Sequence, residues 1–340
     1  MTEPLPSVQD LVYGFMPAQV LRVAAVLGIP DLLAEAPKTA TELAAATETH
    51  AQSLRRLLRG LACLSVVNEI ESDRFELTAA GQQLRADVPN SVRAAVLLFT
   101  SDEVWRSWGQ LEYSVRTGKI AWDHVVGTSV FGFLDEHPEQ SGTFNAAMAD
   151  RTRLVAPRIV ERYDFSRFGT VVDVGGGDGA MLAAILAAEP EVRGVLFDRP
   201  AGAAGAAAKL EAAGVSDRCE IVAGDFFVAV PDGADAYVIK TVLHNWADEQ
   251  CVEILGNCRK AMRHNGTLLV IERVVPPRIE SAAATRAVFM DLNMLVSTPG
   301  RERTEAEYRA LYAAAGFELT EAVATDAEPV GYQVLVGKPA

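Results

Sequence analysis

Three consecutive glycines, followed by Asp178 and Gly179, stand near the middle of this 340-residue chain, in Thr170–Ala180 (TVVDVGGGDGA). Gly175 and Gly177 begin a G-x-G-x-G spacing, which differs from the dinucleotide fingerprint G-x-G-x-x-G. Glycines allow a sharp turn and the close approach of a ligand. The carboxylates of Asp173 and Asp178 favour a cationic ligand over a pyrophosphate. S-adenosylmethionine, which carries an ammonium and a sulfonium but no phosphate, fits this description; a purely structural turn is the alternative.

A third acid follows at a distance that suits the same ligand. Val195–Phe197 is apolar and predicts a strand, and Asp198 closes it 23 residues after Gly175. An acid at the end of a second strand can accept hydrogen bonds from both hydroxyls of a ribose. Alone, Asp198 would be interpreted as a loop or helix-capping residue. Its distance from the glycine turn favours the ribose.

The elements that must position these residues predict a doubly wound parallel sheet. The strand before the glycines and the helix after them form a first crossover, and ligands of such sheets bind at the carboxyl ends of the strands. Further strands are expected at Glu220–Ala223, Ala236–Lys240 and Leu268–Glu272, with helices at Ala201–Ala213 and Asp248–Met262. The C-terminal pattern predicts a helix over Arg303–Gly316 and closing strands at Phe317–Leu319 and Tyr332–Val336.

The first hundred residues have a different pattern. Leu11–Leu27 is helical in periodicity but interrupted by Gly14 and Pro17. Two helices, Thr41–Ala46 and Ser53–Leu64, precede an alternating segment, Val66–Leu77, that predicts a β-hairpin. This is a winged-helix outline. It raises the alternative of a transcriptional regulator, which three arginines on the second helix favour: Arg55, Arg56 and Arg59.

Composition weighs against nucleic acid as a partner. The net charge is −14, and phosphate binding requires clustered Lys and Arg. The first ten residues, MTEPLPSVQD, lack the basic start and apolar run of a signal peptide. Early apolar runs are too short to span a bilayer, and the four cysteines show no C-x-x-C spacing. We therefore expect a cytoplasmic protein without a metal site and without a membrane partner.

Five motifs in order make a specific resemblance. They are Asp173–Gly179, the strand ending at Asp198, Gly224–Phe227 (GDFF), Lys240–Trp246 (KTVLHNW) and Gly300–Thr304 (GRERT). The sequence resembles the S-adenosylmethionine-dependent O-methyltransferases of the caffeate/hydroxyindole type, whose bacterial members modify aromatic secondary metabolites. The resemblance extends over nearly the whole chain.

The resemblance implies an α/β fold with a Rossmann-like class I methyltransferase domain. It assigns residues 1–100 to a mostly α-helical, winged-helix-like dimerisation domain, so we expect a homodimer. Residues 101–164 would form a helical segment that closes the acceptor pocket, and residues 165–340 the catalytic domain. The expected activity is methyl transfer to a hydroxyl of a small aromatic metabolite such as a polyketide, phenazine, quinone or phenol.

The resemblance also assigns the catalytic residues. A phenol has a pKa of roughly 10 and is mostly protonated at neutral pH, whereas histidine is a natural base there. His244 matches the family's base. Glu272, at the end of a neighbouring strand, would hold the second imidazole nitrogen, and Glu302 matches the second flanking carboxylate.

Further residues are expected around the cofactor and the acceptor. The cofactor contacts are Gly175, Gly177, Asp198, Arg199, Gly224, Asp225, Phe226, Lys240 and Trp246. Asp225 would accept from the adenine amino group and Phe226 would pack on the ring. The acceptor candidates are Phe131, Met148, Asp150, Met290, Asn293 and Met294.

One departure from the family pattern concerns the base. Where many members have His-Asp-Trp, this chain has His244-Asn245-Trp246, which removes a charge that would raise the histidine pKa. Some relatives have changed to hydroxylation or decarboxylation. The presence of His244, Glu272 and Glu302 favours ordinary O-methylation.

Overall fold

The chain forms two compact units in a computed structural model that describes residues 7–325 and 331–340. The N-terminal unit comprises residues up to Trp105 together with Gly142–Asp150. The sheet unit comprises Arg106–Ser141 and Arg151–Ala340. Residues 1–6, which begin the stretch without a signal-peptide pattern, lie outside the described residues. Within the described ranges, no helix is both long and apolar enough to cross a membrane.

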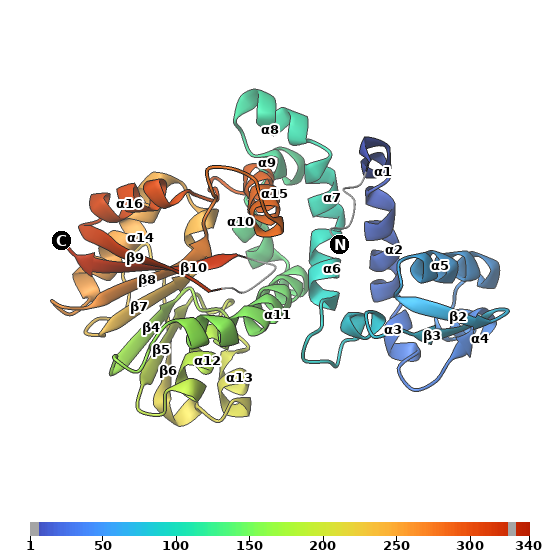
Figure 1. Ribbon diagram of the computed structural model, residues 1–340, viewed down its shortest axis with the longest axis horizontal. Helices are drawn as coiled ribbons and strands as arrows, with labels where there is room; N and C mark the ends of the chain where they lie inside the picture. Colours follow the sequence, from blue (N-terminus) through green and yellow to red (C-terminus); the bar gives the residue numbers. More distant parts are fainter. Residues whose placement is uncertain (1–6, 326–330) are drawn as a thin grey trace. The chain divides into compact units, whose positions relative to one another are not determined.

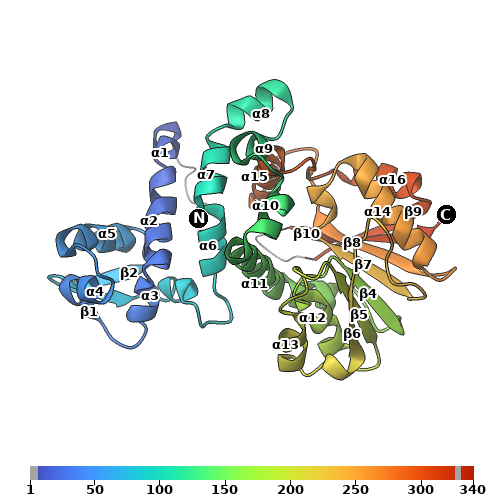
Figure 2. The same cartoon turned by 180° about the vertical axis from the view of Figure 1, so that it is seen from behind.

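The N-terminal unit packs helices against a small antiparallel sheet of order β1-β3-β2 (Figures 1 and 2). Its core joins apolar residues of the helices and of both hairpin strands, among them Leu43, Leu58 and Phe75. The N-terminal helix is broken at Tyr13 and Gly14, as expected for one of the two predicted interruptions; Pro17 lies within the first turn of α2, where proline is tolerated. The elements are α1 (Val8–Val12), α2 (Phe15–Val26), α3 (Ile29–Leu32), β1 (Lys38–Thr39), α4 (Ala40–Ala46), α5 (Ala51–Cys63), β2 (Val67–Glu71), β3 (Arg74–Leu77), η1 (Gly81–Leu84) and α6 (Arg93–Phe99).

The arginines of α5 face acids of the hairpin. Arg55 lies 3.0 Å from Asp73, and Arg59 lies 3.3 Å from Glu69. Because these guanidinium groups already have carboxylate partners, the helix offers less uncompensated positive charge than its sequence suggests. This weakens the observation that favoured a DNA-binding regulator.

Short helices fill most of the segment between the hairpin and the large sheet, as the sequence predicts. They are α7 (Asp102–Trp108), α8 (Leu111–Thr117), α9 (Ala121–Val126), α10 (Val130–Glu136) and the long α11 (Pro138–Arg162). Most of this segment belongs to the sheet unit, and Gly142–Asp150 belongs to the N-terminal unit.

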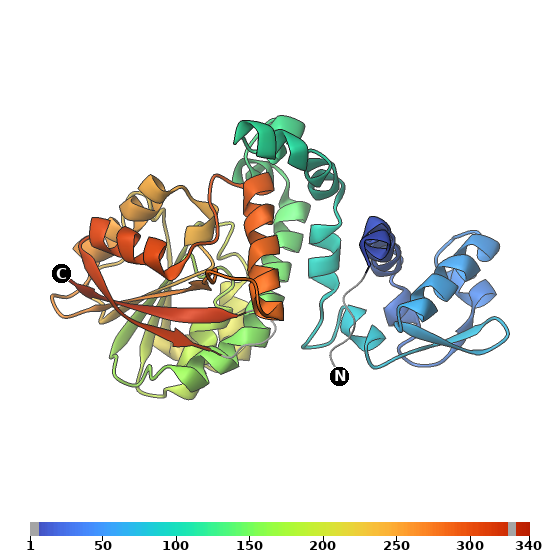
Figure 3. The same ribbon diagram turned by 45° about the horizontal axis from the view of Figure 1, so that its top comes forward.

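The sheet unit is built on a seven-stranded sheet of order β6-β5-β4-β7-β8-β10-β9. The first five in that order pair in parallel, and β10 is antiparallel to both β8 and β9. Figure 3 shows the β9–β10 pair closing one edge. The doubly wound expectation is confirmed. The strands are β4 (Thr170–Val174), β5 (Arg193–Asp198), β6 (Cys219–Ala223), β7 (Ala236–Lys240), β8 (Thr267–Arg273), β9 (Phe317–Ala324) and β10 (Tyr332–Pro339).

Alternate side chains of the central strands enter two separate cores, because successive residues of a strand point to opposite faces. One core contains Val171 and Val238 with apolar residues of α11, α12 (Ala180–Ala188) and α13 (Ala206–Ala212). The other contains Val172 and Ile239 with residues of α14 (Asp248–Ala261) and α16 (Glu305–Ala314). Helices therefore cover both faces, which leaves the carboxyl ends of the parallel strands for the site.

The predicted alanine-rich helix is shorter than expected. It begins at Ala206 rather than at Ala201, because Gly202 and Gly205 interrupt the alanines and glycine is a poor helix former. Two further elements complete the unit, the 3₁₀ turn η3 (Leu243–Asn245) after β7 and the helix α15 (Ala282–Ser297). A short 3₁₀ turn, η2 (Ser216–Arg218), precedes β6.

Candidate active site

The glycine turn follows β4 in the conformation that only glycine adopts easily. Gly175 and Gly177 have φ values of 71° and 59°, in the left-handed region. A Cβ on Gly175 would lie 2.8 Å from a methyl group of Val242, whereas a Cβ on Gly177 would meet nothing within 4 Å. One side of the turn is therefore packed, and the other is open at Gly177.

Three carboxylates surround this turn. Asp198, at the end of β5, accepts from the backbone N–H of Gly177 at 2.8 Å and from that of Arg199 at 2.6 Å. Asp178 lies 3.5 Å from Arg153 of α11. Asp173 is buried, burial raises its pKa to about 7, and its Oδ2 has no hydrogen-bond partner among the described residues. The turn is thus strongly acidic.

The other expected cofactor residues lie on neighbouring segments. Arg199 forms a 2.9 Å ion pair with Asp135 of α10. A Cβ on Gly224 would overlap the ring of Phe197. Asp225 is exposed, and its Oδ1 caps the backbone N–H of Phe227 at 2.9 Å.

An aromatic group lies beside the glycine turn. Phe226 and Phe227 both contact the indole of Trp246 edge-on, with centroids 6.0 and 4.8 Å away. Phe131 of α10 stacks on the same indole at 5.4 Å. These contacts join a predicted acceptor residue, Phe131, to two predicted cofactor residues.

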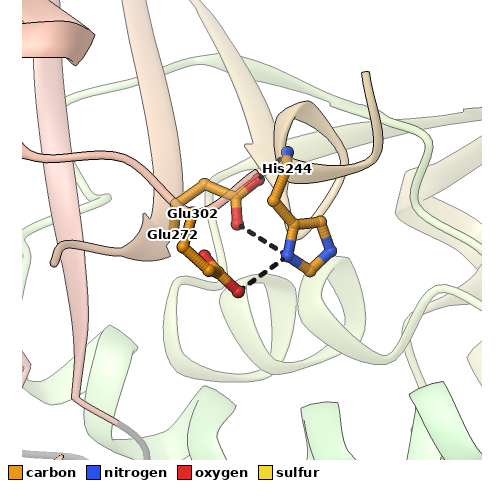
Figure 4. A group of neighbouring side chains, drawn as sticks. All are labelled: His244, Glu272 and Glu302. Atoms are coloured by element: carbon orange, nitrogen blue, oxygen red, sulfur yellow. Dashed lines mark hydrogen bonds and ion pairs between the residues drawn. The ribbon is translucent and has the colours of Figure 1, made fainter. Parts of the chain in front are cut away.

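His244 lies in η3, directly after β7, and is buried with two acids (Figure 4). Its Nδ1 is 3.0 Å from Oε1 of Glu302 and 3.9 Å from Oε2 of Glu272. Figure 4 shows both contacts at one ring nitrogen, with the other nitrogen, Nε2, pointing away from the carboxylates. If Nδ1 carries the proton toward Glu302, Nε2 offers a lone pair on the opposite side of the ring.

Glu302, rather than Glu272, makes the short contact with the imidazole. The sequence assigns that place to Glu272, whose Oε2 lies farther from Nδ1, at 3.9 Å, and whose Oε1 accepts from the backbone N–H of His244 at 3.4 Å. Glu272 is the next-to-last residue of β8 and lies beside the backbone of η3, while Glu302 approaches the ring from the segment before α16. Glu272 therefore contacts the backbone of η3, and Glu302 makes the shorter contact with the imidazole ring.

The pKa values of His244, Glu272 and Glu302 are determined by their burial and by the charges that they exert on one another. Burial lowers the pKa of His244, but Glu272 and Glu302 outweigh it and raise that pKa to about 9. Burial raises the pKa of Glu272 to about 7. Burial acts upward on Glu302 too, yet the imidazole and Arg273 hold its pKa below the ordinary value. The two carboxylates therefore favour the imidazolium over the neutral imidazole in the ligand-free protein.

Two buried arginines that the sequence did not single out support these residues. Arg303 donates to the carbonyl oxygens of Leu243 at 3.1 Å and Trp246 at 2.8 Å, on either side of His244. Arg273 donates to Glu302 at 3.2 Å. Arginine is mostly exposed in proteins, so no local pattern marks these two as buried. The motif GRERT itself is the signal that could have indicated Arg303.

Lys240 ends β7 below the site and is almost fully buried. Its Nζ donates to the hydroxyls of Thr152 at 3.0 Å and Thr241 at 3.3 Å. Thr241 has a φ of 51°, which is a strained value for a β-branched residue. This strained residue links the end of β7 to η3 and so to His244.

The expected acceptor residues divide between the two units. Asn293 accepts from the indole N–H of Trp108 at 3.0 Å, Met290 contacts a guanidinium nitrogen of Arg151 at 3.6 Å, and Met294 is buried on α15. These three belong to the sheet unit, as does Phe131. Met148 and Asp150 belong to the N-terminal unit.

Comparison with known proteins decides the family. An O-methyltransferase domain model matches residues 108–318, more than half of the chain, and an O-methyltransferase dimerisation domain model matches residues 9–87. The chain belongs to the O-methyltransferase family. It is therefore a methyltransferase of class I fold, and its cofactor is S-adenosylmethionine.

Relatives of this methyltransferase are named as O-methyltransferases of O-demethylpuromycin and of phenazine, and one solved structure is of an O-methyltransferase from neocarzinostatin biosynthesis. It is 44% identical to an O-demethylpuromycin-O-methyltransferase of Streptomyces alboniger, over 91% of this chain and 83% of that protein. It is 43% identical to a phenazine O-methyltransferase of Lysobacter antibioticus, over 95% and 94% of the two chains. A solved O-methyltransferase of neocarzinostatin biosynthesis, in complex with S-adenosylmethionine and 2-hydroxy-5-methyl naphthoic acid, superposes with a TM-score of 0.78 at 35% identity over 95% of each chain.

The residues around the glycine turn of the methyltransferase fit a cationic cofactor. The side of Gly177 is open, and carboxylate groups lie around it. A buried Asp173 oxygen still has acceptor capacity. The spacing of His244, Glu272 and Glu302, with one ligand atom each within 4.8 Å of the others, is also short enough for a metal ion. One of these acids, Glu302, already has a buried cationic partner in Arg273.

Proposed function

We propose that the protein transfers a methyl group to a hydroxyl of a small aromatic metabolite, with His244 as the general base. The observation that carries this proposal is the buried contact between Nδ1 of His244 and Glu302, which leaves Nε2 on the opposite side. A base must present a lone pair within hydrogen-bond reach of the proton it accepts. Relatives named for puromycin and phenazine methylation support an aromatic acceptor.

The base acts as follows in this proposal. Nε2 takes the proton of the acceptor hydroxyl as its oxygen becomes nucleophilic, and Glu302 stabilises the imidazolium through Nδ1. Glu272 and Arg303 hold the backbone on which the imidazole is carried. When bound, S-adenosylmethionine supplies the methyl group from a sulfonium. Because the pKa of His244 is about 9 in the ligand-free protein, a neutral imidazole requires raised pH or a nearby cation that lowers the pKa.

We further propose that the acids at the strand ends hold the cofactor. Asp198 is suited to the ribose hydroxyls, since a carboxylate has about four lone-pair sites and only two backbone donors reach it among the described residues. Gly175 and Gly177 leave room for the cofactor, Gly224, Asp225 and Phe226 lie on the next strand end, and Trp246 supplies an aromatic wall. Lys240 donates to threonine hydroxyls and Arg199 pairs with Asp135, so we place these two side chains at the edge of the cofactor site.

The acceptor and the oligomeric state complete the proposal. Phe131, Met290, Asn293 and Met294 come from α10 and α15, and flexible methionines suit a flat aromatic ring. Met148 and Asp150 stay predictions from the resemblance. A homodimer through the N-terminal unit is supported by the dimerisation model at residues 9–87. A cytoplasmic location stays a prediction from the sequence.

The test is a labelled methyl-transfer screen with matched acceptors. Catechols, hydroxynaphthoates, hydroxyphenazines and aromatic polyketides are each compared with their own methyl ether, which lacks the reacting hydroxyl. We expect incorporation with at least one hydroxylated compound and none with its ether. Transfer that persists with the ether, or cofactor binding without transfer to any class, would contradict the proposal. Salt-sensitive, sequence-specific retention of DNA would support the regulator instead.

The base is tested with the acceptor found in that screen. His244→Gln should lower kcat by about 10²–10⁴-fold, the usual contribution of a positioned general base, while calorimetry shows nearly unchanged cofactor affinity. His264→Gln is the control, because His264 is exposed in the turn before β8. Raising the pH toward the pKa of the phenol should partly restore the rate of His244→Gln. Equal kcat for wild type and variant well below that pKa would remove His244 from the mechanism.

A further inference from the structure

Arg273 is the last residue of β8 and is completely buried. It follows Glu272 directly, so the two side chains leave opposite faces of the strand. Across the antiparallel pair, Arg273 is opposite Tyr332 of β10. Its Nη2 donates to the Tyr332 hydroxyl at 3.1 Å, and its guanidinium carbon lies 4.8 Å from the centre of the tyrosine ring. Arg273 is therefore held from one side by an aromatic partner.

On its other side, Arg273 shares a carboxylate oxygen with the imidazole. Oε1 of Glu302 lies 3.0 Å from Nδ1 of His244 and 3.2 Å from Nη1 of Arg273. Oε2 of Glu302 has no hydrogen-bond partner among the described residues. Two donors thus share one oxygen atom, while the second oxygen of the same carboxylate makes no contact of this kind. Neither side chain is exposed to water, so this shared contact is not screened by solvent.

Other charged and titratable groups also face this set. Glu272 and Tyr332 act on His244, and Lys240 acts on Glu272. The backbone N–H of Glu302 donates to Asp291 of α15 at 2.9 Å. Tyr308 of α16 lies near both glutamates, with Arg303 and Cys251 near it in turn. Among these residues, Arg273 is the cation that donates a hydrogen bond to Oε1 of Glu302, the same oxygen that contacts Nδ1 of His244.

We propose that Arg273 is a positioning residue that, by sharing Oε1 of Glu302 with His244, weakens the hold of that carboxylate on the imidazole proton. This inference rests on the proposed role of His244 as the base. A positive charge beside Glu302 offsets part of the negative potential that otherwise favours the imidazolium. Arg273 thereby brings proton release from His244 toward the pH at which the enzyme works. Tyr332 keeps the guanidinium in place through its hydroxyl and its ring.

The first measurement concerns the imidazole itself and needs no acceptor. The pKa of His244 is followed by NMR of ¹³C-labelled histidine in the full-length chain, with the His244→Gln spectrum identifying the signal among the five histidines. Arg273→Gln removes the charge but keeps an N–H donor for Glu302. We expect the His244 pKa to rise by about one unit or more, because the variant loses a positive charge that reaches the imidazole through Oε1 of Glu302. Arg273→Lys retains the charge and should stay near the wild type.

The second measurement is the pH–rate profile of the same variants. For Arg273→Gln, the acid limb of the kcat/KM profile should move to higher pH. At a fixed pH on that limb, kcat/KM should fall about tenfold for each unit by which the pKa rises. The rate should recover at higher pH. A merely structural role would lower the rate equally at every pH. A changed NMR titration without a changed rate profile would leave the Arg273 coupling intact but contradict His244 as the base. An unchanged NMR titration would overturn the inference.

Tyr332→Phe tests the inference if Arg273→Gln does not fold, which thermal melting will show. This variant removes only the hydroxyl that anchors Nη2. We expect a smaller upward change in the pKa of His244, because the guanidinium is less firmly held against Glu302. If Tyr332→Phe folds and neither the titration nor the rate profile moves, the anchoring part of the inference is wrong. That result would reduce Arg273 to a packing residue.

Discussion

The backbone of Gly300 lies directly against the carbonyl oxygen of His244. A Cβ built on Gly300 would overlap that oxygen and also the backbone nitrogen of Trp246. The segment Gly300–Thr304 is further tied to the end of β8 by a bridge between Val274 and Arg303. Because Gly300 has no side chain, the backbone of the Gly300–Thr304 segment can contact the backbone of η3. This close approach brings Glu302 within reach of the imidazole.

Gly300→Ala should displace η3 and so lower both the activity and the stability of the protein. The added methyl group meets backbone atoms, which cannot move aside as a flexible side chain would; overpacking of this kind costs roughly 1–3 kcal/mol. We expect kcat to fall at least about tenfold while cofactor affinity changes little. The control is Gly256→Ala in α14, where a Cβ meets nothing within 4 Å and alanine stabilises a helix by roughly 0.5–1 kcal/mol. Equal kcat in Gly300→Ala and wild type would contradict the close approach.

Asp198→Ala should weaken S-adenosylmethionine binding at least about tenfold in calorimetry. The carboxylate ends β5 beside the open Gly177, and each hydrogen bond to a charged group contributes about 1.5–3 kcal/mol. The variant also loses an acceptor for the N–H of Gly177, so thermal melting is measured in parallel. Asp232→Ala, in an exposed loop before β7, is the control. A folded Asp198→Ala variant with wild-type affinity would exclude Asp198 from the cofactor site.

A charge placed on the exposed apolar face of α1 and α2 should dissociate the proposed homodimer. Leu11 and Phe15 are 61% and 52% exposed, among other exposed apolar residues of the same two helices, and patches of this kind mark interfaces. We expect wild type to have a dimer mass by light scattering at micromolar concentration, and Leu11→Glu/Phe15→Glu a monomer mass. Val228→Glu, at a 79% exposed valine of the sheet unit, should remain dimeric. A monomeric wild type would rule the proposal out.

Local patterns were sufficient for most of the fold. The apolar runs around Val171 and Val195 predicted β4 and β5 because buried parallel strands are continuously apolar. The glycines and Asp198 were placed together correctly because strand ends of a parallel sheet share one edge. The alanine-rich helix was predicted too long, since alanine content outweighed the two glycines at its start. These successes and this error all depend on residues close together in sequence.

The inner contacts of the site could not be predicted in the same way. Glu302 lies 58 positions from His244, and nothing local specifies that it, rather than Glu272, makes the short contact with the ring. Arg273 and Arg303 belong to a residue type that is usually exposed, so their burial depends on carboxylate and carbonyl partners from other segments. Such partners become visible only when the backbone of Gly300–Thr304 is placed beside β8.

Glu302→Gln provides the opposite charge change to Arg273→Gln, and its expected effect on pH dependence follows from the same contacts. Glu302 raises the pKa of His244 both by its charge and by its hydrogen bond. Without that charge, the pKa of the imidazole should fall below about 9, and the acid limb of the rate profile should move to lower pH. The plateau rate should also fall, because a neutral amide stabilises an imidazolium less than a carboxylate does.

The same pKa values give a sign for stability. His244 has a folded-state pKa above its ordinary value of about 6.5, so its contribution to the free energy of unfolding is complete below that ordinary value and is lost as the pH rises through about 9. In Glu302→Gln this loss should begin at lower pH. Glu305→Gln, which removes a half-exposed carboxylate from an ion pair with Arg309, should leave both pH profiles as in wild type. A Glu302→Gln variant whose acid limb stays in place, while that of Arg273→Gln moves, would show that Glu302 does not transmit charge to the base.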